Sequence, residues 1–163
     1  MKILAFVDVH GNKKALNEIV KKSKNADLLI CAGDLTNFGH DMNKLMNILS
    51  KTGKMLLIIP GNHEAIADIR SLKQNFIVDI HKKLYKFDDV VFFGYGSGGF
   101  SLYDKGMERV LDEIKKNIKG KKFVLVTHAP PYGTFVDLIG IAHCGSLSIT
   151  KFIVETNPIV NIC

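Results

Sequence analysis

The feature that most limits the fold is a series of short apolar segments that alternate, in the first third of the chain, with amphipathic ones. The apolar segments are β-friendly and stop at Asp, Gly or Pro, which is typical of buried strands. The intervening segments carry apolar residues at helical spacing. The expected strands are 3–9, 27–34 and 54–60, and the expected helices are 13–23 and 41–53, with Gly53 as a stop signal. This pattern predicts a βαβαβ unit with right-handed crossovers.

The pattern changes after a short expected helix at 64–72. Three strand-like segments at 76–80, 83–87 and 90–96 follow one another without helices, and Asp88-Asp89 reads as a tight hairpin turn, so antiparallel pairing is expected here. The remaining segments are a helix at 107–118, a strand at 122–128, a long loop at 129–145, a helix at 147–156 and a strand at 158–163. The sequence therefore predicts an α/β fold that mixes parallel and antiparallel strands.

Length and composition favour one domain over residues 1–163, with no linker or repeat. No stretch reaches the ~18–20 apolar residues that span a bilayer, and the N-terminus lacks the features of a signal peptide. Three cysteines without a CxxC motif indicate free thiols in a reducing compartment. We therefore expect a cytoplasmic protein without a membrane partner.

The net charge of +6 comes almost wholly from lysines, since Arg70 and Arg109 are the only arginines. Most lysine pairs are expected on solvated helix faces and strand edges. Nucleic-acid binding favours clustered basic residues interleaved with aromatic ones, and that pattern is missing. The charge supports a small phosphorylated substrate and argues against a nucleic-acid partner.

Polar residues that can bind metal ions gather where the predicted strands end. The ends carry Asp8 and His10, then Asp34, then Asn62 and His63, and finally His128. In open α/β sheets, active sites collect beyond the carboxyl ends of the strands, and residues two apart in a strand face the same side. Oxygen and imidazole ligands without thiolates suit Mn²⁺, Fe, Co²⁺, Ni²⁺ or Zn²⁺. The set is too large for one ion and fits a two-ion site, with ions ~3.5–4 Å apart and bridged by a carboxylate.

Other residues leave alternatives open. Gly94–Gly99 matches Gly-x-Gly-x-x-Gly but follows a hairpin strand and precedes no immediate helix, so we expect a loop near the site rather than a dinucleotide site. His40 and His81 are expected on the surface, while His143 could contact substrate. Glu64 is expected to begin a helix, where a carboxylate is favoured, with support of the site ligands as the alternative.

The series "DVHG", "GD", "GNHE" and "THAPP" resembles the calcineurin-like metallophosphoesterases, and most closely their small, cap-less prokaryotic and archaeal phosphodiesterase-like members. The resemblance runs from Lys2 to the end of the chain. It implies a sandwich of two mixed β-sheets flanked by helices. It also implies hydrolysis of phosphate esters by a metal-bridging hydroxide, with two divalent transition metal ions, Mn²⁺ being favoured over Ni²⁺, Co²⁺, Fe or Zn²⁺.

The same resemblance implies a role for each site residue. Asp8 and His10 would bind the first ion, and Asp34 would bridge both ions. Asn62 and His128 would bind the second ion. His63 would face the substrate as the catalytic residue, protonating the leaving oxygen or stabilising charge.

The sequence departs from the family pattern in two places. Asn37 and Pro60 stand where protein phosphatases carry arginines that clamp phosphate, which argues against that activity. The family's Gly-His-x-His, with one more ligand for each ion, is absent before Cys163, so we expect either a chain that continues or a metal-poor site. A protein-interaction scaffold of weak catalytic ability and a nuclease remain the alternative functions, although a nuclease would need an added capping domain.

Overall fold

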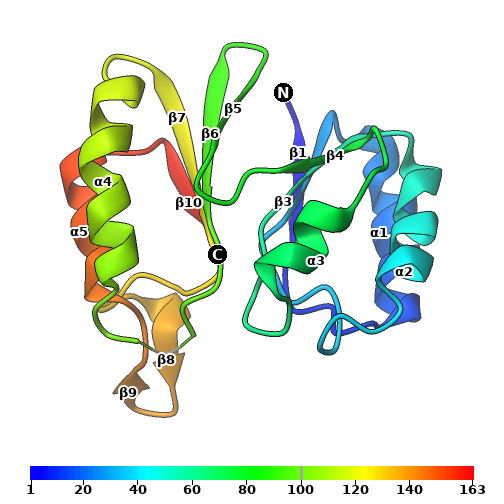
Figure 1. Ribbon diagram of the computed structural model, residues 1–163, viewed down its shortest axis with the longest axis horizontal. Helices are drawn as coiled ribbons and strands as arrows, with labels where there is room; N and C mark the ends of the chain where they lie inside the picture. The colour runs from blue at the N-terminus through cyan, green and yellow to red at the C-terminus, as the bar shows by residue number, and fades with distance from the viewer. Residues whose placement is uncertain (100) are drawn as a thin grey trace.

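The computed structural model describes residues 1–99 and 101–163, and it places two four-stranded sheets face to face with helices outside them (Figure 1). In the first sheet, all strands are parallel and adjacent in chain order. These strands are β1 (Ile3–Phe6), β2 (Leu28–Cys31), β3 (Met55–Ile58) and β4 (Ile77–Asp79). The second sheet has the order β10-β7-β6-β5 and is mixed. Its strands are β5 (Leu84–Phe87), β6 (Val90–Tyr95), β7 (Lys122–Thr127) and β10 (Val160–Ile162).

Helices cover the outer face of each sheet (Figure 1). The first sheet is covered by α1 (Lys13–Lys22) and α2 (Met42–Leu49), with the short α3 (Ile66–Ser71) between β3 and β4. The second sheet is covered by α4 (Lys105–Ile118) and α5 (Leu147–Thr156). Single 3-10 turns lie at Ser23–Asn25, Ser50–Thr52 and Phe135–Asp137. The result is four layers in the order helix, sheet, sheet, helix, which confirms the α/β fold predicted from the sequence patterns and the sandwich that the family resemblance implies.

Alternation along the strands explains why both sheets are buried on both faces. In β2, Leu29 and Cys31 pack against the outer helices, while Leu28 and Ile30 join the core between the sheets. Successive strand residues point to opposite faces, so a strand buried on both sides has to be apolar throughout. All four β2 residues are buried, as the uninterrupted apolar run predicts.

The pairing of the middle strands was only partly predicted. β5 and β6 are antiparallel and are joined by a tight turn in which Asp88 has a φ of 53°, which confirms the hairpin at Asp88-Asp89. The antiparallel prediction is wrong for β4, because α3 forms a crossover that brings β4 parallel to β3. The first sheet is therefore parallel throughout rather than mixed.

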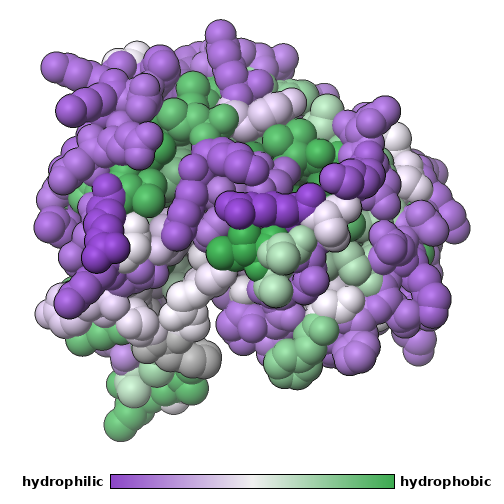
Figure 2. All heavy atoms as spheres, viewed as in Figure 1, coloured by the Kyte–Doolittle hydropathy of each residue, from purple (hydrophilic) through white to green (hydrophobic). Residues whose placement is uncertain are grey.

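The expected long loop after β7 contains a projecting hairpin, formed by β8 (Leu138–Ile139) and β9 (Ala142–His143). The hairpin is tied to its base by the buried carboxylate of Asp137. Burial alone would raise the pKa of Asp137, but hydrogen bonds from His143 and from backbone N–H groups hold it at about 2. Phe135, in the 3-10 turn that precedes the hairpin, and Ile141, at its tip, are fully exposed, and Figure 2 shows hydrophobic surface there.

Among the described residues, α4 is the longest helix at 14 residues, and no helix has the length and apolar character needed to cross a bilayer.

The core between the sheets can be tested with Leu57→Ala. Leu57 is fully buried between the sheets, so truncation should lower the free energy of unfolding by ~2–5 kcal/mol, through lost apolar contact and the cavity left behind. Val154→Ala on the exposed face of α5 is the control and should change it by no more than ~0.5 kcal/mol. Urea unfolding measures both variants. Equal effects would contradict the placement of Leu57 between the sheets.

Candidate metal centre

The polar residues that follow the strands line one pocket of about 360 Å³ at the carboxyl edge of the two sheets. The pocket is lined by Asp8, His10, Asp34, Asn62, His63, Gly99, His128, Ala129 and Pro130. All six residues predicted for the site are in this set. A larger hollow of about 530 Å³ lies elsewhere, beside Lys86 and Lys122, and its lining contains one carboxylate and no imidazole.

Asp34 lies at the centre of the pocket, with its side chain only 5% exposed. Its Oδ2 is 3.7 Å from Nε2 of His10 and 4.0 Å from Nε2 of His63. Its Oδ1 is 3.7 Å from Nε2 of His128. These separations are too long for hydrogen bonds. They suit ligands that share an ion, because two ligands bound at ~2.0–2.2 Å lie roughly 3–4 Å apart.

Two groups of possible ligands meet at Asp34. His10, Asp34 and His63 form one group, and Asp8, Asp34 and His128 form the other, with all ligand atoms of a group within 4.8 Å of one another. A carboxylate shared by two groups is what a bridged pair of ions requires. The grouping differs from the one that the family resemblance implies, since Asp8 pairs with His128 and His63 lies with His10.

His128 presents a lone pair to the pocket. Its Nδ1 lies 3.0 Å from the carbonyl oxygen of Ala32, which can only accept, so Nδ1 carries the proton and donates it. Nε2 is then unprotonated in the neutral ring and faces Oδ1 of Asn62 at 2.9 Å. An amide oxygen and an imidazole nitrogen that face the same point can bind one ion, so this part of the pocket fits a bound metal ion.

Backbone conformation, rather than strand periodicity, directs Asp8 and His10 into the pocket. β1 ends at Phe6, and Asp8, His10 and Asp34 have φ values of 54°, 47° and 51°. The expectation that Asp8 and His10 share a strand face is therefore wrong, although both residues reach the pocket. Left-handed conformations at non-glycine residues are costly and collect at functional sites. The two turns support each other through hydrogen bonds from His10 N to Asp34 O and from Gly11 N to Leu35 O.

Glu64 fixes the distance between the loops that follow β2 and β3. Its buried carboxylate accepts hydrogen bonds from the N–H groups of Asp34, Thr36 and Gly61. The hydroxyl of Thr36 is a fourth donor, at 2.7 Å. The loops are so close that a Cβ on Gly61 would lie 2.0 Å from Oδ1 of Asp34, so only glycine fits there.

The expected role of Glu64 as the first residue of a helix is wrong. α3 begins at Ile66, and Asp68 provides the carboxylate of its first turn. Glu64 instead supports the site ligands, which was the alternative that the sequence left open. The signal that could have found this role is "GNHE" itself, because a carboxylate next to buried glycine turns can satisfy several backbone N–H groups.

His63 lies at the mouth of the pocket, with 24% of its side chain exposed. Its ring stacks on Phe38 at a centroid distance of 4.3 Å and meets the edge of His10 at 4.7 Å. Its backbone N–H donates to Oδ1 of Asp34 at 2.9 Å. His63 can therefore reach both the centre of the site and a substrate entering from outside.

The other histidines lie outside this pocket. His40 is exposed, as expected. His81 was expected on the surface, but it is 1% exposed, because the chain passes between the two sheets at this point. Nδ1 of His143 lies 2.7 Å from Oδ1 of Asp137, so His143 helps to hold the hairpin base.

The family profile described as calcineurin-like phosphoesterase matches residues 1–158. The chain belongs to this family. A crystal structure with 17% sequence identity has the same fold, with a TM-score of 0.82, over 98% of this chain and 82% of that one. Two carboxylates, three imidazoles and an amide at one edge of the sheets form a suitable donor set for the divalent metals that calcineurin-like phosphoesterases typically bind.

Curated relatives of this calcineurin-like phosphoesterase have no assigned activity. An uncharacterized protein of Methanocaldococcus jannaschii is 31% identical over 176 aligned positions, which span the whole chain and 78% of that protein. A UPF0046 protein of Caenorhabditis elegans is 25% identical over 78% of this chain and 54% of its own length. The expectation of either a chain that continues into Gly-His-x-His or a metal-poor site stays a prediction.

Glu64→Gln tests the buried carboxylate. Whichever oxygen becomes an amide nitrogen, it will face two N–H or O–H donors, and each buried donor left unsatisfied costs ~1–3 kcal/mol. We expect a loss of that order in the free energy of unfolding, measured by urea denaturation, together with weaker Mn²⁺ binding. Glu18→Gln on the exposed face of α1 makes the same chemical change and should cost less than ~1 kcal/mol. A Glu64→Gln protein as stable as wild type would show that the carboxylate is dispensable.

Proposed function

We propose that this calcineurin-like phosphoesterase hydrolyses a small phosphate ester at a two-ion centre built around Asp34. Membership of the family supports hydrolysis of phosphate esters in general. The observation that carries the two-ion proposal is the position of Asp34, whose two oxygens face separate groups of possible ligands.

The donor set favours transition metal ions. Asp8, Asp34 and Asn62 offer oxygens, His10 and His128 offer imidazole nitrogens, and no thiolate is among the described residues that line the pocket. Such ligands suit Mn²⁺ as well as Ni²⁺, Co²⁺, Fe or Zn²⁺, with Mn²⁺ as our first choice. Two bound ions would supply Lewis acidity and a nucleophilic water of lowered pKa.

The pocket lining favours a small substrate held through its phosphate. A volume of about 360 Å³ lies near the lower end of the ~300–1,000 Å³ range of small-molecule sites. The lining residues include no lysine or arginine, so no basic side chain of the lining clamps the phosphate. This agrees with Asn37 and Pro60 at the positions where protein phosphatases carry arginines.

We assign His63 the catalytic role of proton donor or charge stabiliser for the leaving oxygen. A general acid has to lie within hydrogen-bond reach of the leaving group, and His63 lies at the pocket mouth. Stacking on Phe38 and contact with His10 restrict its ring. The competing role, an ion ligand grouped with His10 and Asp34, makes a different prediction for metal content.

The proposed reaction is tested with bis(p-nitrophenyl) phosphate and p-nitrophenyl phosphate, with Mn²⁺, Ni²⁺ or Co²⁺ added to metal-free protein. Turnover should require the ion and should fall to the level of the chelator control when the ion is removed. Because all ligands surround Asp34, Asp34→Asn should lower both activity and bound metal. If none of these ions supports turnover of these esters or of a broader panel of phosphate compounds, the proposal is refuted. A protein that binds no metal at all would favour the scaffold alternative.

His63→Ala separates the two roles of that histidine. As a proton donor, its loss should lower kcat by about 10²–10⁴-fold, while the metal content measured by elemental analysis stays unchanged. His40→Ala, at an exposed histidine outside the pocket lining, is the control and should leave both quantities unchanged. A parallel loss of metal and activity in His63→Ala would show that His63 is a ligand.

A further inference from the structure

His81 is a buried histidine that the proposed reaction does not use. It lies in the connection between β4 and β5, where the chain leaves the first sheet for the second, and it is 1% exposed. Its Nδ1 accepts a hydrogen bond of 2.9 Å from the N–H of Gly96. Its Nε2 is buried without a hydrogen-bond partner in the described part of the chain. An unpaired buried polar atom costs free energy, so the position of His81 calls for an explanation.

The group that His81 holds through its other ring nitrogen is the peptide unit between Tyr95 and Gly96, at the carboxyl end of β6. Its N–H donates to Nδ1 of His81, and its C=O accepts the backbone N–H of His128 at 3.3 Å. One planar peptide therefore joins His81 to His128. Bonds arranged in such a chain also polarise and strengthen one another.

The second observation is the division of the site between the sheets. Asp8, Asp34 and Asn62 follow strands of the first sheet, whereas His128 follows β7 of the second. The 2.9 Å from Nε2 of His128 to Oδ1 of Asn62 therefore depends on how the sheets are held against each other. Any residue that fixes the end of β6 to the first sheet also helps to fix His128.

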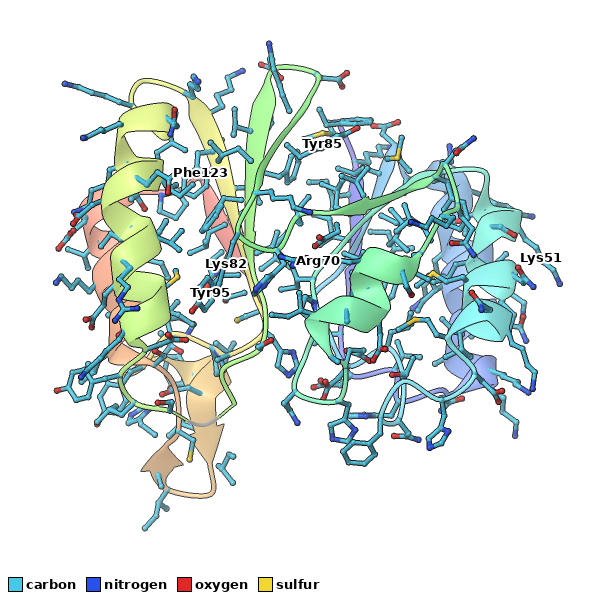
Figure 3. The ribbon with its side chains drawn as sticks, in the orientation of Figure 1. Lys51, Arg70, Lys82, Tyr85, Tyr95 and Phe123 are labelled. Atoms are coloured by element: carbon cyan, nitrogen blue, oxygen red, sulfur yellow. The ribbon has the colours of Figure 1, made fainter. Side chains whose placement is uncertain are left out.

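The connection carrying His81 makes this link. His81 forms a parallel bridge with Gly94, the N–H of Lys82 donates to Gly94 O at 2.7 Å, and the N–H of Gly94 donates to Ile80 O. After the end of β6, the N–H of Ser97 donates to Pro60 O at 2.9 Å, and this bond ties the glycine-rich segment Gly94–Gly99 to the residues that follow β3. Figure 3 labels Lys82 and Tyr95 in this region, where the Lys82 ammonium lies 5.2 Å from the centre of the Tyr95 ring.

We propose that His81 is a positioning residue for the metal centre, acting through the Tyr95–Gly96 peptide to hold His128 at its distance from Asn62 and Asp34. The inference rests on the proposed function. It requires His81 to be neutral, with the proton on Nε2, because a protonated Nδ1 would face the N–H of Gly96. Burial, and then the charge of Lys82, lower the pKa of His81 to about 4, which keeps the ring neutral near pH 7.

Two substitutions separate positioning from bulk. His81→Phe keeps an aromatic ring and removes the acceptor, whereas Oδ1 of the side chain in His81→Asn stands where Nδ1 stood and can accept from Gly96. Loss of a residue that orients a metal ligand typically weakens binding by about 10–100-fold. We expect His81→Phe to weaken the binding of one of two Mn²⁺ ions by that factor in calorimetric titration, and His81→Asn to restore most of the lost affinity.

Ile80→Val is the matched control, because it removes one methylene from a buried neighbour of His81 and leaves the hydrogen bond intact. If Ile80→Val lowers the Tm as much as His81→Phe does but leaves the ion affinity unchanged, then lower stability alone does not explain the weaker ion binding of His81→Phe. Equal ion affinities in wild type, His81→Phe and His81→Asn would overturn the inference while leaving the proposed function standing. A wild-type protein that binds no ion would instead overturn the proposed function, and the inference with it.

The wild-type protein provides a test that does not depend on folding of the variants. In a nitrogen-detected magnetic resonance titration with Zn²⁺, Nδ1 of His81 should have the shift of an unprotonated acceptor. The Gly96 amide and the His81 ring should then change in step with the His128 ring as the ion binds. A protonated Nδ1, or Gly96 and His81 signals that stay fixed while His128 changes, would refute the link.

Discussion

The candidate site depends first on the hydrogen bonds that the buried carboxylate of Glu64 accepts. Parallel strands β2 and β3 end at the same edge, and the turns that follow them expose N–H groups with no partner in the sheet. Glu64 gathers the N–H groups of Asp34, Thr36 and Gly61 onto two oxygens. A charged acceptor forms stronger hydrogen bonds than a neutral one, so one side chain can hold both turns. The position of Asp34 follows from this arrangement.

The two-sheet architecture gives the site its second requirement. A single parallel sheet could supply the carboxylates and the amide, but His128 comes from the other sheet and reaches the pocket only if both sheets end at the same edge. The apolar core between the sheets sets their separation, and polar contacts at the edge set their relative position. Packing between the sheets thus sets the approximate spacing of the ligands, and hydrogen bonds at the edge of the sheets set it more closely.

Local sequence patterns predicted much of this arrangement. The apolar runs located the strands of the sandwich, and the polar residues after them identified six of the nine described residues that line the pocket. The patterns failed where the outcome depends on residues distant in the chain. β4 joined the first sheet by pairing with β3, about 20 positions earlier, Glu64 satisfies donors about 30 positions away, and His81 is buried by a contact with the end of β6. Asp8 and His10 were correctly predicted to line the pocket, but the reason given, a shared strand face, was wrong. Left-handed turns produce no periodic sequence pattern from which they could be predicted.

The residues in left-handed conformation show how the ligands of the site are preorganised for ion binding. Asp8, His10 and Asp34 each hold a conformation that costs on the order of 1–3 kcal/mol, and such a cost is tolerated only where surrounding contacts leave no alternative. Hydrogen bonds between the two turns and the clamp by Glu64 supply those contacts. Ligands that are already in position lose little further conformational entropy when an ion binds, so free energy spent in folding reduces the cost of binding. The buried hydrogen bonds therefore hold the strained residues in place, and the sandwich supplies the rigidity that the pocket requires.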